Sequence, residues 1–387
     1  MNLQRTEPLL LFGAPVGMYT GKVRSYLRKN GIPYSERLPS DPIFQKQLLP
    51  RLKRFINPVI RMPDGTVVQD TADIIDFLEA RGLARHPSTP ATPRQRIVAL
   101  ILDLYGSDGL VRPAMHYRWG YRDQNEAFLR HEFGLSYRPG RAAPEVVEQQ
   151  LGNFMNYLHS HLPNLGIDAT TALVIEACYE ELLTTLDAHL RAQPYALGGL
   201  PTIADYGLMA PLYAHLARDP VPATLMKSKA PSLYRWTERM NAPDHDAPEF
   251  PHTPYALPDD DAVPDTLRPL LRQIATDFVP EVEMTVRALD RWWRAHGHEG
   301  LVGQPAERGL VRDCFTLRGT PVTTVVAPYL IYKLQRVTDA WDALDDAGRA
   351  SVAAFVDGTG LEPLLTLKPL RRIERREFLE VWGAATA

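Results

Sequence analysis

The sequence predicts an α/β domain, then an all-α domain, then a mainly helical C-terminal extension, within 387 residues. The first observation is that apolar residues switch between short continuous runs and helical spacing over residues 1–83. The second is that apolar spacing is helical throughout residues 84–242. The third is that residues 243–264 are rich in proline and aspartate, as is typical of a linker, before helical spacing resumes over residues 265–387.

The first domain is expected to follow the element order βαβα and then ββα. Apolar runs predict strands over residues 9–12, 32–38, 58–62 and 66–68, and helical spacing predicts helices over 20–30, 44–52 and 71–81. Gly31 and Gly82 stand where glycine ends a helix, and Pro63-Asp64-Gly65 supplies the turn between the last two strands. This order is that of a thioredoxin-like domain, although several other α/β folds begin in the same way.

Composition and charge argue against several classes of function. Lys and Arg number 43 against 46 Asp and Glu, and the net charge of -3 offers no broad positive surface for nucleic acid or anionic membranes. The two cysteines lie far apart without the spacing of a metal site, which predicts a reducing compartment and no metal. Apolar stretches are too short for a signal sequence or a membrane span. We therefore expect a soluble, cytoplasmic protein.

Three groups of motifs carry a resemblance to a known family. They are Asn57-Pro58-Val59-Ile60 with Asp64-Gly65 and Asp70-Thr71, the segment 197–205 that ends in Thr202-Ile203-Ala204-Asp205, and Ala230-Pro231-Ser232-Leu233-Tyr234-Arg235-Trp236. Together they resemble the glutathione S-transferase superfamily of bacterial type, in which a cis proline opens the third strand. The resemblance implies a thioredoxin-like glutathione-binding domain over 1–83 and an all-α transferase domain over 84–242. Residues 265–387 exceed an ordinary member of the family.

The resemblance implies that glutathione is a co-substrate bound by the first domain. The residues expected to bind it are Pro58, Val59, Asp70, Thr71, Lys53 and Arg54. Val59 should pair its backbone with the cysteinyl residue like an added strand, Asp70 should hold the γ-glutamyl ammonium group, and Thr71 the neighbouring carboxylate. One of the two basic residues should bind the glycine carboxylate. The alternatives are that Asp70-Thr71 only caps a helix and that the basic residues are solvated surface charges.

The sequence departs from the family at the catalytic position. Aligning Lys22-Val23 with the end of the pattern S-P-x-S-x-x-V places Gly17 where the family carries a catalytic Ser or Cys. Thr20 then holds the second polar position, as a possible cap whose hydroxyl or N–H reaches a sulfur, and Tyr19 offers a phenol as a second donor. We expect Thr20, ahead of Tyr19, to stabilise the thiolate. The alternative is that Thr20 only caps the helix and Tyr19 only packs.

The second substrate is expected against the first helix of the α-domain, which forms one wall of an apolar cleft in the family. The candidate residues there are Tyr105, Met115, His116, Arg118 and Trp119. This mixture of aromatic and polar side chains predicts an aromatic or electrophilic ligand, with an acidic group on Arg118. The alternative is that aromatic residues at helical spacing simply form core.

Two functions compete at this point. The first is a glutathione transferase or thiol reductase that attacks a small hydrophobic or aromatic electrophile, as in detoxification. The second is a non-catalytic protein of the same architecture that binds partners through its extension; Gly17 favours this function, whereas Pro58 and Asp70-Thr71 favour the first. The resemblance also implies a homodimer between the first domain of one chain and the helical domain of the other, unless the extension covers that surface.

Overall fold

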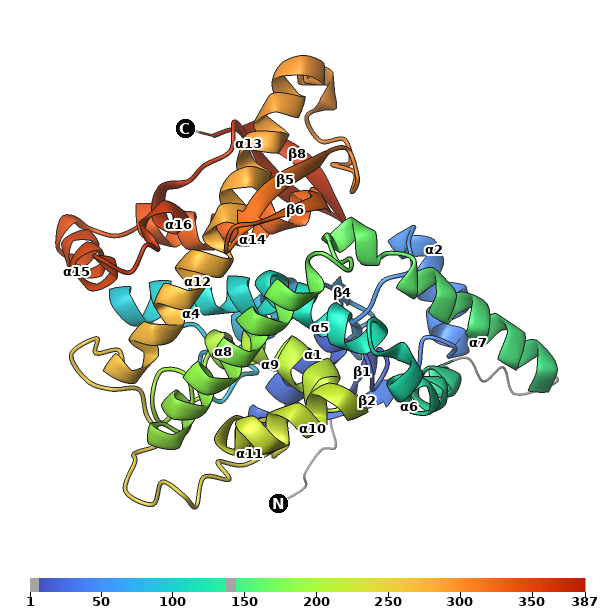
Figure 1. Ribbon diagram of the computed structural model, residues 1–387, viewed down its shortest axis with the longest axis horizontal. Helices are drawn as coiled ribbons and strands as arrows, with labels where there is room; N and C mark the ends of the chain where they lie inside the picture. Colours follow the sequence, from blue (N-terminus) through green and yellow to red (C-terminus); the bar gives the residue numbers. More distant parts are fainter. Residues whose placement is uncertain (1–6, 137–143, 387) are drawn as a thin grey trace.

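The computed structural model describes residues 7–136 and 144–386. It consists of a thioredoxin-like domain, a helical domain and an extension that packs against both (Figure 1). Figure 1 shows the extension, in orange and red, gathered on one side of the blue-to-green domains. In the part of the chain so described, no helix is both long and apolar enough to cross a lipid bilayer.

The N-terminal domain confirms the predicted order of strands and helices. Its elements are β1 (Leu9–Phe12), α1 (Met18–Lys29), β2 (Tyr34–Arg37), a π-helical turn (Phe44–Leu48), α2 (Leu49–Leu52), β3 (Val59–Arg61), β4 (Val67–Gln69) and α3 (Thr71–Ala80). The sheet has the order β2-β1-β3-β4, with β1 parallel to β2 and antiparallel to β3. Gly31, Gly65 and Gly82 have positive φ at the expected turns, and the peptide bond before Pro58 is cis.

The second domain is helical, as its spacing predicts. Its longer helices are α4 (Pro93–Leu104), α5 (Val111–Trp119), α6 (Arg122–Ser136), α7 (Pro144–His159), α8 (Ala172–Ala192), α9 (Ile203–Pro211), α10 (Pro220–Lys229) and α11 (Pro231–Asn241). The central helix α9 starts with the expected capping box, since the buried Asp205 carboxylate accepts the Thr202 N–H at 2.9 Å. Trp236 of α11 donates to the same carboxylate at 3.2 Å, so this cap also fixes α11 against α9.

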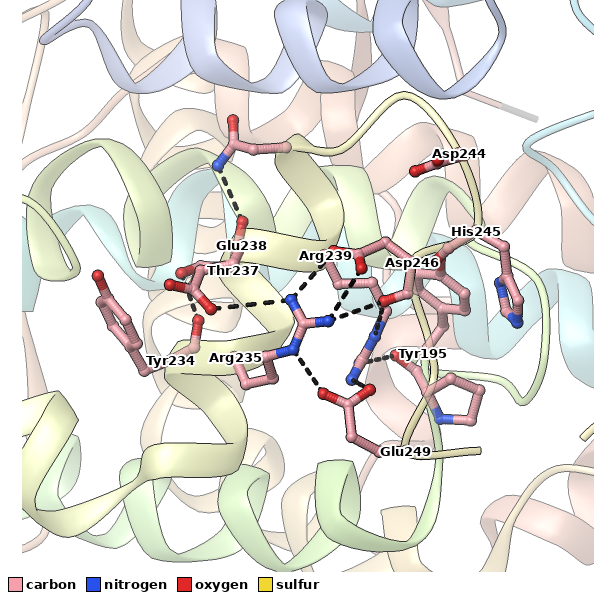
Figure 2. Close-up of polar contacts among 12 residues, drawn as sticks. Tyr195, Tyr234, Arg235, Thr237, Glu238, Arg239, Asp244, His245, Asp246 and Glu249 are labelled. Carbon is pink, nitrogen blue, oxygen red and sulfur yellow. Dashed lines mark hydrogen bonds and ion pairs between the residues drawn. The ribbon is translucent and has the colours of Figure 1, made fainter. Parts of the chain in front are cut away.

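Residues 243–264 form an ordered strap instead of a free linker. Figure 2 shows Arg235 and Arg239 of α11 converging on Asp246 and Glu249 of the strap. Farther along, the Asp261 carboxylate accepts two backbone N–H groups from the first turn of α4, at 2.7 and 2.9 Å. The strap therefore caps α4 and holds the start of the extension against the helical domain.

The extension combines helices with two β-hairpins. Its main elements are α12 (Arg268–Asp277), α13 (Val279–His296), β5 (Arg312–Leu317), β6 (Thr320–Val325), α14 (Pro328–Asp342), α15 (Asp346–Val356), α16 (Glu362–Thr366), β7 (Arg371–Arg376) and β8 (Leu379–Ala385). The extension was expected to be mainly helical, but the apolar stretch that begins at Val322 starts as a strand, and the basic cluster Arg371–Arg376 is the first strand of the β7–β8 hairpin. In β7, Ile373 is buried between the more exposed Arg372 and Glu374, which is the alternation of a strand.

Helix α14 joins the extension to α3. The contacts follow both helices in order: Tyr329 to Asp70 at 3.1 Å, Tyr332 to Asp73 at 2.6 Å, and Arg336 to Asp76 at 2.5 and 3.0 Å. Arg375 of β7 adds a second cation, 3.4 Å from Asp70 and 3.1 Å from Asp73. We call this set of contacts the α3–α14 ladder, and it commits the carboxylates of Asp70, Asp73 and Asp76 to the extension.

A buried ionic cluster connects all three parts of the chain. Asp103 of α4 binds Lys22 of α1 on one carboxylate oxygen and Lys333 of α14 on the other, the latter at 2.5 Å. Both lysine side chains are completely buried. Burial lowers the pKa of Lys22 to about 8, while the two ammonium groups overcome the effect of burial on Asp103 and hold its pKa below its ordinary value.

Candidate functional site

Two cavities meet at the N-terminus of α1. One has a volume of about 550 Å³ and mostly apolar walls, and the other has a volume of about 410 Å³ and more polar walls. Tyr19, Phe55 and Asn57 line both. We call these cavities the apolar pocket and the polar pocket. Their junction lies where the free N–H groups and the positive end of α1 favour a negative charge.

The start of α3 forms part of the polar pocket. Asp70 is the N-cap of α3 and accepts the Ala72 N–H at 3.0 Å, and Thr71 follows it as a buried residue. Asp70 has φ 82° and ψ 142°, a conformation that costs a non-glycine residue on the order of 1–3 kcal/mol. Its carboxylate also accepts the Tyr329 hydroxyl and lies 3.4 Å from Arg375. Asp70 thus lies at the expected place and caps the helix, but a cation of the extension already faces it.

The strand that follows the cis proline lies in the centre of the sheet. Val59 pairs with Phe12 of β1 on one side and with Gln69 of β4 on the other, so it has no open edge for an added strand. Asn57 and Pro58 line the polar pocket, whereas Val59 is fully buried. Backbone pairing by a ligand, which we expected at Val59, would have to take place at Asn57.

The two basic residues expected at the glycine carboxylate face the β7–β8 hairpin. Arg54 donates to the Glu380 carboxylate at 2.8 and 3.2 Å and to the Phe378 carbonyl at 2.8 Å. Lys53 is exposed and lies 3.5 Å from Glu377. Neither lines the polar pocket. The extension therefore pairs with both of the basic residues that the resemblance assigned to the glycine carboxylate of glutathione.

The two residues expected to stabilise the thiolate lie differently from each other. Gly17 caps α1, and Thr20 is its third residue, fully buried against Gly13. The Thr20 hydroxyl lies 3.5 Å from the Asn57 side-chain oxygen, so it can orient that amide. Tyr19 lines both pockets, but its hydroxyl donates to the Ser107 carbonyl at 2.9 Å. Burial, together with Asp108, raises the pKa of Tyr19, which disfavours a phenolate.

The candidate residues for the second substrate separate into two groups. Met115, Arg118 and Trp119 line the apolar pocket. Tyr105 instead lies in the π-helical turn Tyr105–Gly109 and packs against Phe278 in another cavity. His116 is buried and hydrogen-bonded to Glu176 at 2.8 Å, outside the pocket.

Arg118 lines the pocket but has no donor left for a ligand. It forms two hydrogen bonds with the Asp219 carboxylate, at 2.6 and 2.7 Å, and Asp219 has no exposed surface. Its remaining N–H groups contact the carbonyls of Val16 and Ala214 and the ring of His215. Since a guanidinium has five N–H donors, these contacts occupy all of them. Arg118 therefore anchors the loop before α1 and does not serve an acidic ligand group.

Several lining residues were missed by the sequence analysis. Asn57 stands within the motif that identified the cis proline, and its side chain could have been considered there. Asp108, Arg308 and Tyr329 also line the polar pocket. Arg308 and Tyr329 belong to the extension. The one signal in the sequence for the extension's side of the pocket is that the tyrosines of α14 are spaced like the aspartates of α3 with which they pair. Among the residues that the structure describes, no cluster of three metal-ligating side chains occurs.

Comparison with solved structures gives relatives of low identity. The chain is similar to the beta-etherase LigF from Sphingobium sp. strain SYK-6, with 18% identity, a TM-score of 0.44, and coverage of 61% of this chain and 96% of that chain. It is also similar to the glutathione transferase GSTFuA3 from Phanerochaete chrysosporium, with 17% identity, a TM-score of 0.40, and coverage of 62% and 98%. A glutathione S-transferase from Methylobacterium radiotolerans JCM 2831, in complex with glutathione sulfonate, has 20% identity, a TM-score of 0.34, and coverage of 67% and 100%.

Comparison with protein families is more decisive. No protein of curated function matches the chain. The family of the glutathione S-transferase N-terminal domain matches residues 11–84, and that of the C-terminal domain matches residues 163–244. These two ranges fall within the thioredoxin-like domain and the helical domain, with the extension outside both. Residues 11–84 and 163–244 of this chain therefore carry the N-terminal and C-terminal domains of the glutathione S-transferase superfamily.

Proposed function

We propose that this protein is a glutathione-dependent transferase or thiol reductase that acts on a small hydrophobic or aromatic electrophile. The observation that carries the proposal is the junction of a polar and an apolar pocket at the start of α1. Glutathione occupies the polar pocket, with its γ-glutamyl carboxylate at Thr71 and the N-terminus of α3. Its sulfur lies at the junction, and the electrophile lies in the apolar pocket beside Met115 and Trp119.

The chemistry requires a stabilised thiolate at the junction. The first turn of α1 carries no acidic residue and no side-chain cap, so its N–H groups are open to a negative sulfur. Asn57 supplies a further donor: with the Thr20 hydroxyl directed at its oxygen, its amide nitrogen is left to face the pockets. The sulfur then bonds to an electrophilic carbon as the leaving group departs with the bonding electrons. With a disulfide, the sulfur forms a mixed disulfide and releases a thiolate.

The first test is calorimetric titration with reduced glutathione, followed by turnover of a chlorodinitrobenzene and of an aromatic disulfide. We expect saturable binding, together with a rise in the thermal unfolding temperature as the glutathione concentration increases. We expect Asn57→Ala to lower kcat about ten- to hundredfold, and Thr20→Val to lower it less because Thr20 acts through Asn57. Absence of heat and of thermal stabilisation at several millimolar glutathione would overturn the proposal.

A non-catalytic glutathione-transferase-like protein is the second candidate, and one observation favours it. The groups that the resemblance assigns to glutathione are partly engaged by the extension, namely Asp70 by Arg375 and Arg54 by Glu380. Glutathione binding without turnover of either substrate type would select this candidate over the first.

The oligomeric state is a separate part of the proposal. The family resemblance implies a homodimer, but α14 and α15 already pack on α4, and the ladder covers one side of α3. A homodimer would therefore have to use other faces of the two domains. Light scattering on the full chain distinguishes a monomer from a dimer.

A further inference from the structure

Four charged side chains line the polar pocket, and they differ in whether they have a partner of opposite charge. They are Asp70, Asp108, Glu281 and Arg308. Two of the carboxylates already face cations: Asp70 lies 3.4 Å from Arg375, and Glu281 accepts two hydrogen bonds from Arg112, at 2.6 and 3.0 Å. Over the described ranges 7–136 and 144–386, neither the Asp108 side chain nor the Arg308 side chain has a hydrogen bond or an ion pair, and the two do not pair with each other. One unpaired anion and one unpaired cation therefore line the same 410 Å³ cavity.

Asp108 is an unfavourable residue for the protein alone. Its Oδ2 atom is shielded from solvent and has no hydrogen-bond partner. Burial raises the pKa of Asp108 to about 7, and the charges of Asp103 and Asp70 raise it against the opposing attraction of Lys333. A buried polar atom without a partner costs about 1–3 kcal/mol, so its presence in a pocket indicates a partner that the chain itself does not provide. A ligand cation is the group that would satisfy it.

Arg308 belongs to the C-terminal extension and lines the same pocket as Asp108. It precedes β5 and belongs to the wall that the extension supplies. Its side chain is exposed, and its positive charge acts on Tyr19, opposing the rise in pKa that burial causes there. Arg308 is the only cation among the residues that line the polar pocket. A guanidinium in this position suits a carboxylate, which it can bind through two parallel hydrogen bonds.

We propose that Asp108 and Arg308 bind the two ends of one zwitterionic peptide ligand, Asp108 its free ammonium group and Arg308 its C-terminal carboxylate. The identity of the ligand as glutathione rests on the proposed function above. The ammonium is then bound by Asp108 instead of Asp70, which Arg375 already neutralises. The glycine carboxylate is bound by Arg308 instead of Lys53 or Arg54, which face Glu377 and Glu380. The extension thereby supplies Arg308, and the helical domain supplies Asp108, to a pocket that also has residues of the first domain in its wall.

The test measures the binding of glutathione, and of two analogues that each lack one of its charges, to the wild type and to two variants. Calorimetry on the full chain compares glutathione, N-acetylglutathione without the ammonium, and the glycine ethyl ester without the carboxylate. We expect Asp108→Asn to weaken glutathione binding about ten- to hundredfold while binding N-acetylglutathione as the wild type does. Arg308→Gln should weaken glutathione binding to a similar extent while binding the ethyl ester as the wild type does. Lys53→Gln, which removes an exposed cation near the same domain, should change none of these affinities.

The possible outcomes separate the two proposals. Asn has the size of Asp, and Arg308 is exposed, so we expect both variants to fold; circular dichroism with thermal unfolding checks this. If glutathione binds but either variant loses the same factor for glutathione and for the matching analogue, the assignment of Asp108 and Arg308 is wrong while the proposed function stands. The same holds if neither variant weakens glutathione binding. If the wild type binds none of the three ligands at several millimolar, the proposed function and this assignment both fail.

Discussion

Replacing Asp103 by asparagine tests whether the buried ionic cluster stabilises the assembly of the three parts. The change leaves Lys22 and Lys333 fully buried without a counterion, and such a loss costs about 3–5 kcal/mol of the free energy of unfolding. A lysine can avoid this cost by losing its proton. From the ordinary pKa of 10.5, that loss costs about 5 kcal/mol at pH 7 but only about 2 kcal/mol at pH 9. We therefore expect Asp103→Asn to destabilise the chain strongly at pH 7 and less at pH 9, where Lys22, with its pKa of about 8, is already largely neutral in the wild type.

The sign follows from proton binding. In the variant, the folded state binds fewer protons than the unfolded state at neutral pH, so its stability rises as the pH rises toward 10.5. Urea unfolding at both pH values measures the two losses. Asp76→Asn is the matched control, because Asp76 pairs with Arg336 at the same interface but is half-exposed, and it should cost less than about 1 kcal/mol at either pH. A loss for Asp103→Asn below about 1 kcal/mol at pH 7, or an equal loss at both pH values, would refute the reasoning.

Three further predictions concern other contacts. Arg118→Met leaves its buried carboxylate partner unpaired and should cost about 3–5 kcal/mol in urea unfolding; wild-type stability with weaker binding of acidic electrophiles would contradict this. Tyr329→Phe removes one hydrogen bond of the ladder and should lower stability by about 1–2 kcal/mol in thermal unfolding, and an unchanged Tm would count against that bond. Burial raises the pKa of Cys178 to about 12, whereas Cys314 is exposed, so a thiol reagent at pH 8 should label Cys314 alone until the chain unfolds, as mass spectrometry of native and urea-treated protein would reveal.

The fold of the first domain could be predicted because its signals are local. Gly31, Gly65 and Gly82 adopt positive φ at turns that their neighbours specify, and the apolar run of β1 is short and buried. The hairpins of the extension were missed for a physical reason. Arg371–Arg376 is almost entirely charged, so only Ile373 carries the alternation that distinguishes a strand from an ion-paired helix.

The site was predicted less completely, because side-chain roles depend on distant partners. Arg118 stands among aromatic residues that suggest a ligand, but the groups that engage it, Asp219 and Val16, are 101 and 102 residues away in the sequence. The motif predicted that a helix starts at Asp70, as it does, yet the partner Arg375 comes from a segment outside the two ranges that match the family. Short-range sequence patterns identify the start of the helix. Which group pairs with the Asp70 carboxylate there depends on tertiary packing, which brings Arg375 to it.

The α3–α14 ladder has a thermodynamic consequence for ligand binding. The polar pocket is lined by the first domain, the helical domain and the extension, so a ligand that contacts the extension and either of the other parts links them. Ligand binding and docking of the extension are then thermodynamically coupled. A ligand that binds the docked arrangement more tightly than the undocked one stabilises docking, and a substitution that weakens docking lowers the affinity for that ligand. Arg336 and Asp76 form an ion pair that helps to dock the extension, and neither lines the pocket. They can therefore change the apparent affinity for the ligand by changing the fraction of molecules in which the extension is docked.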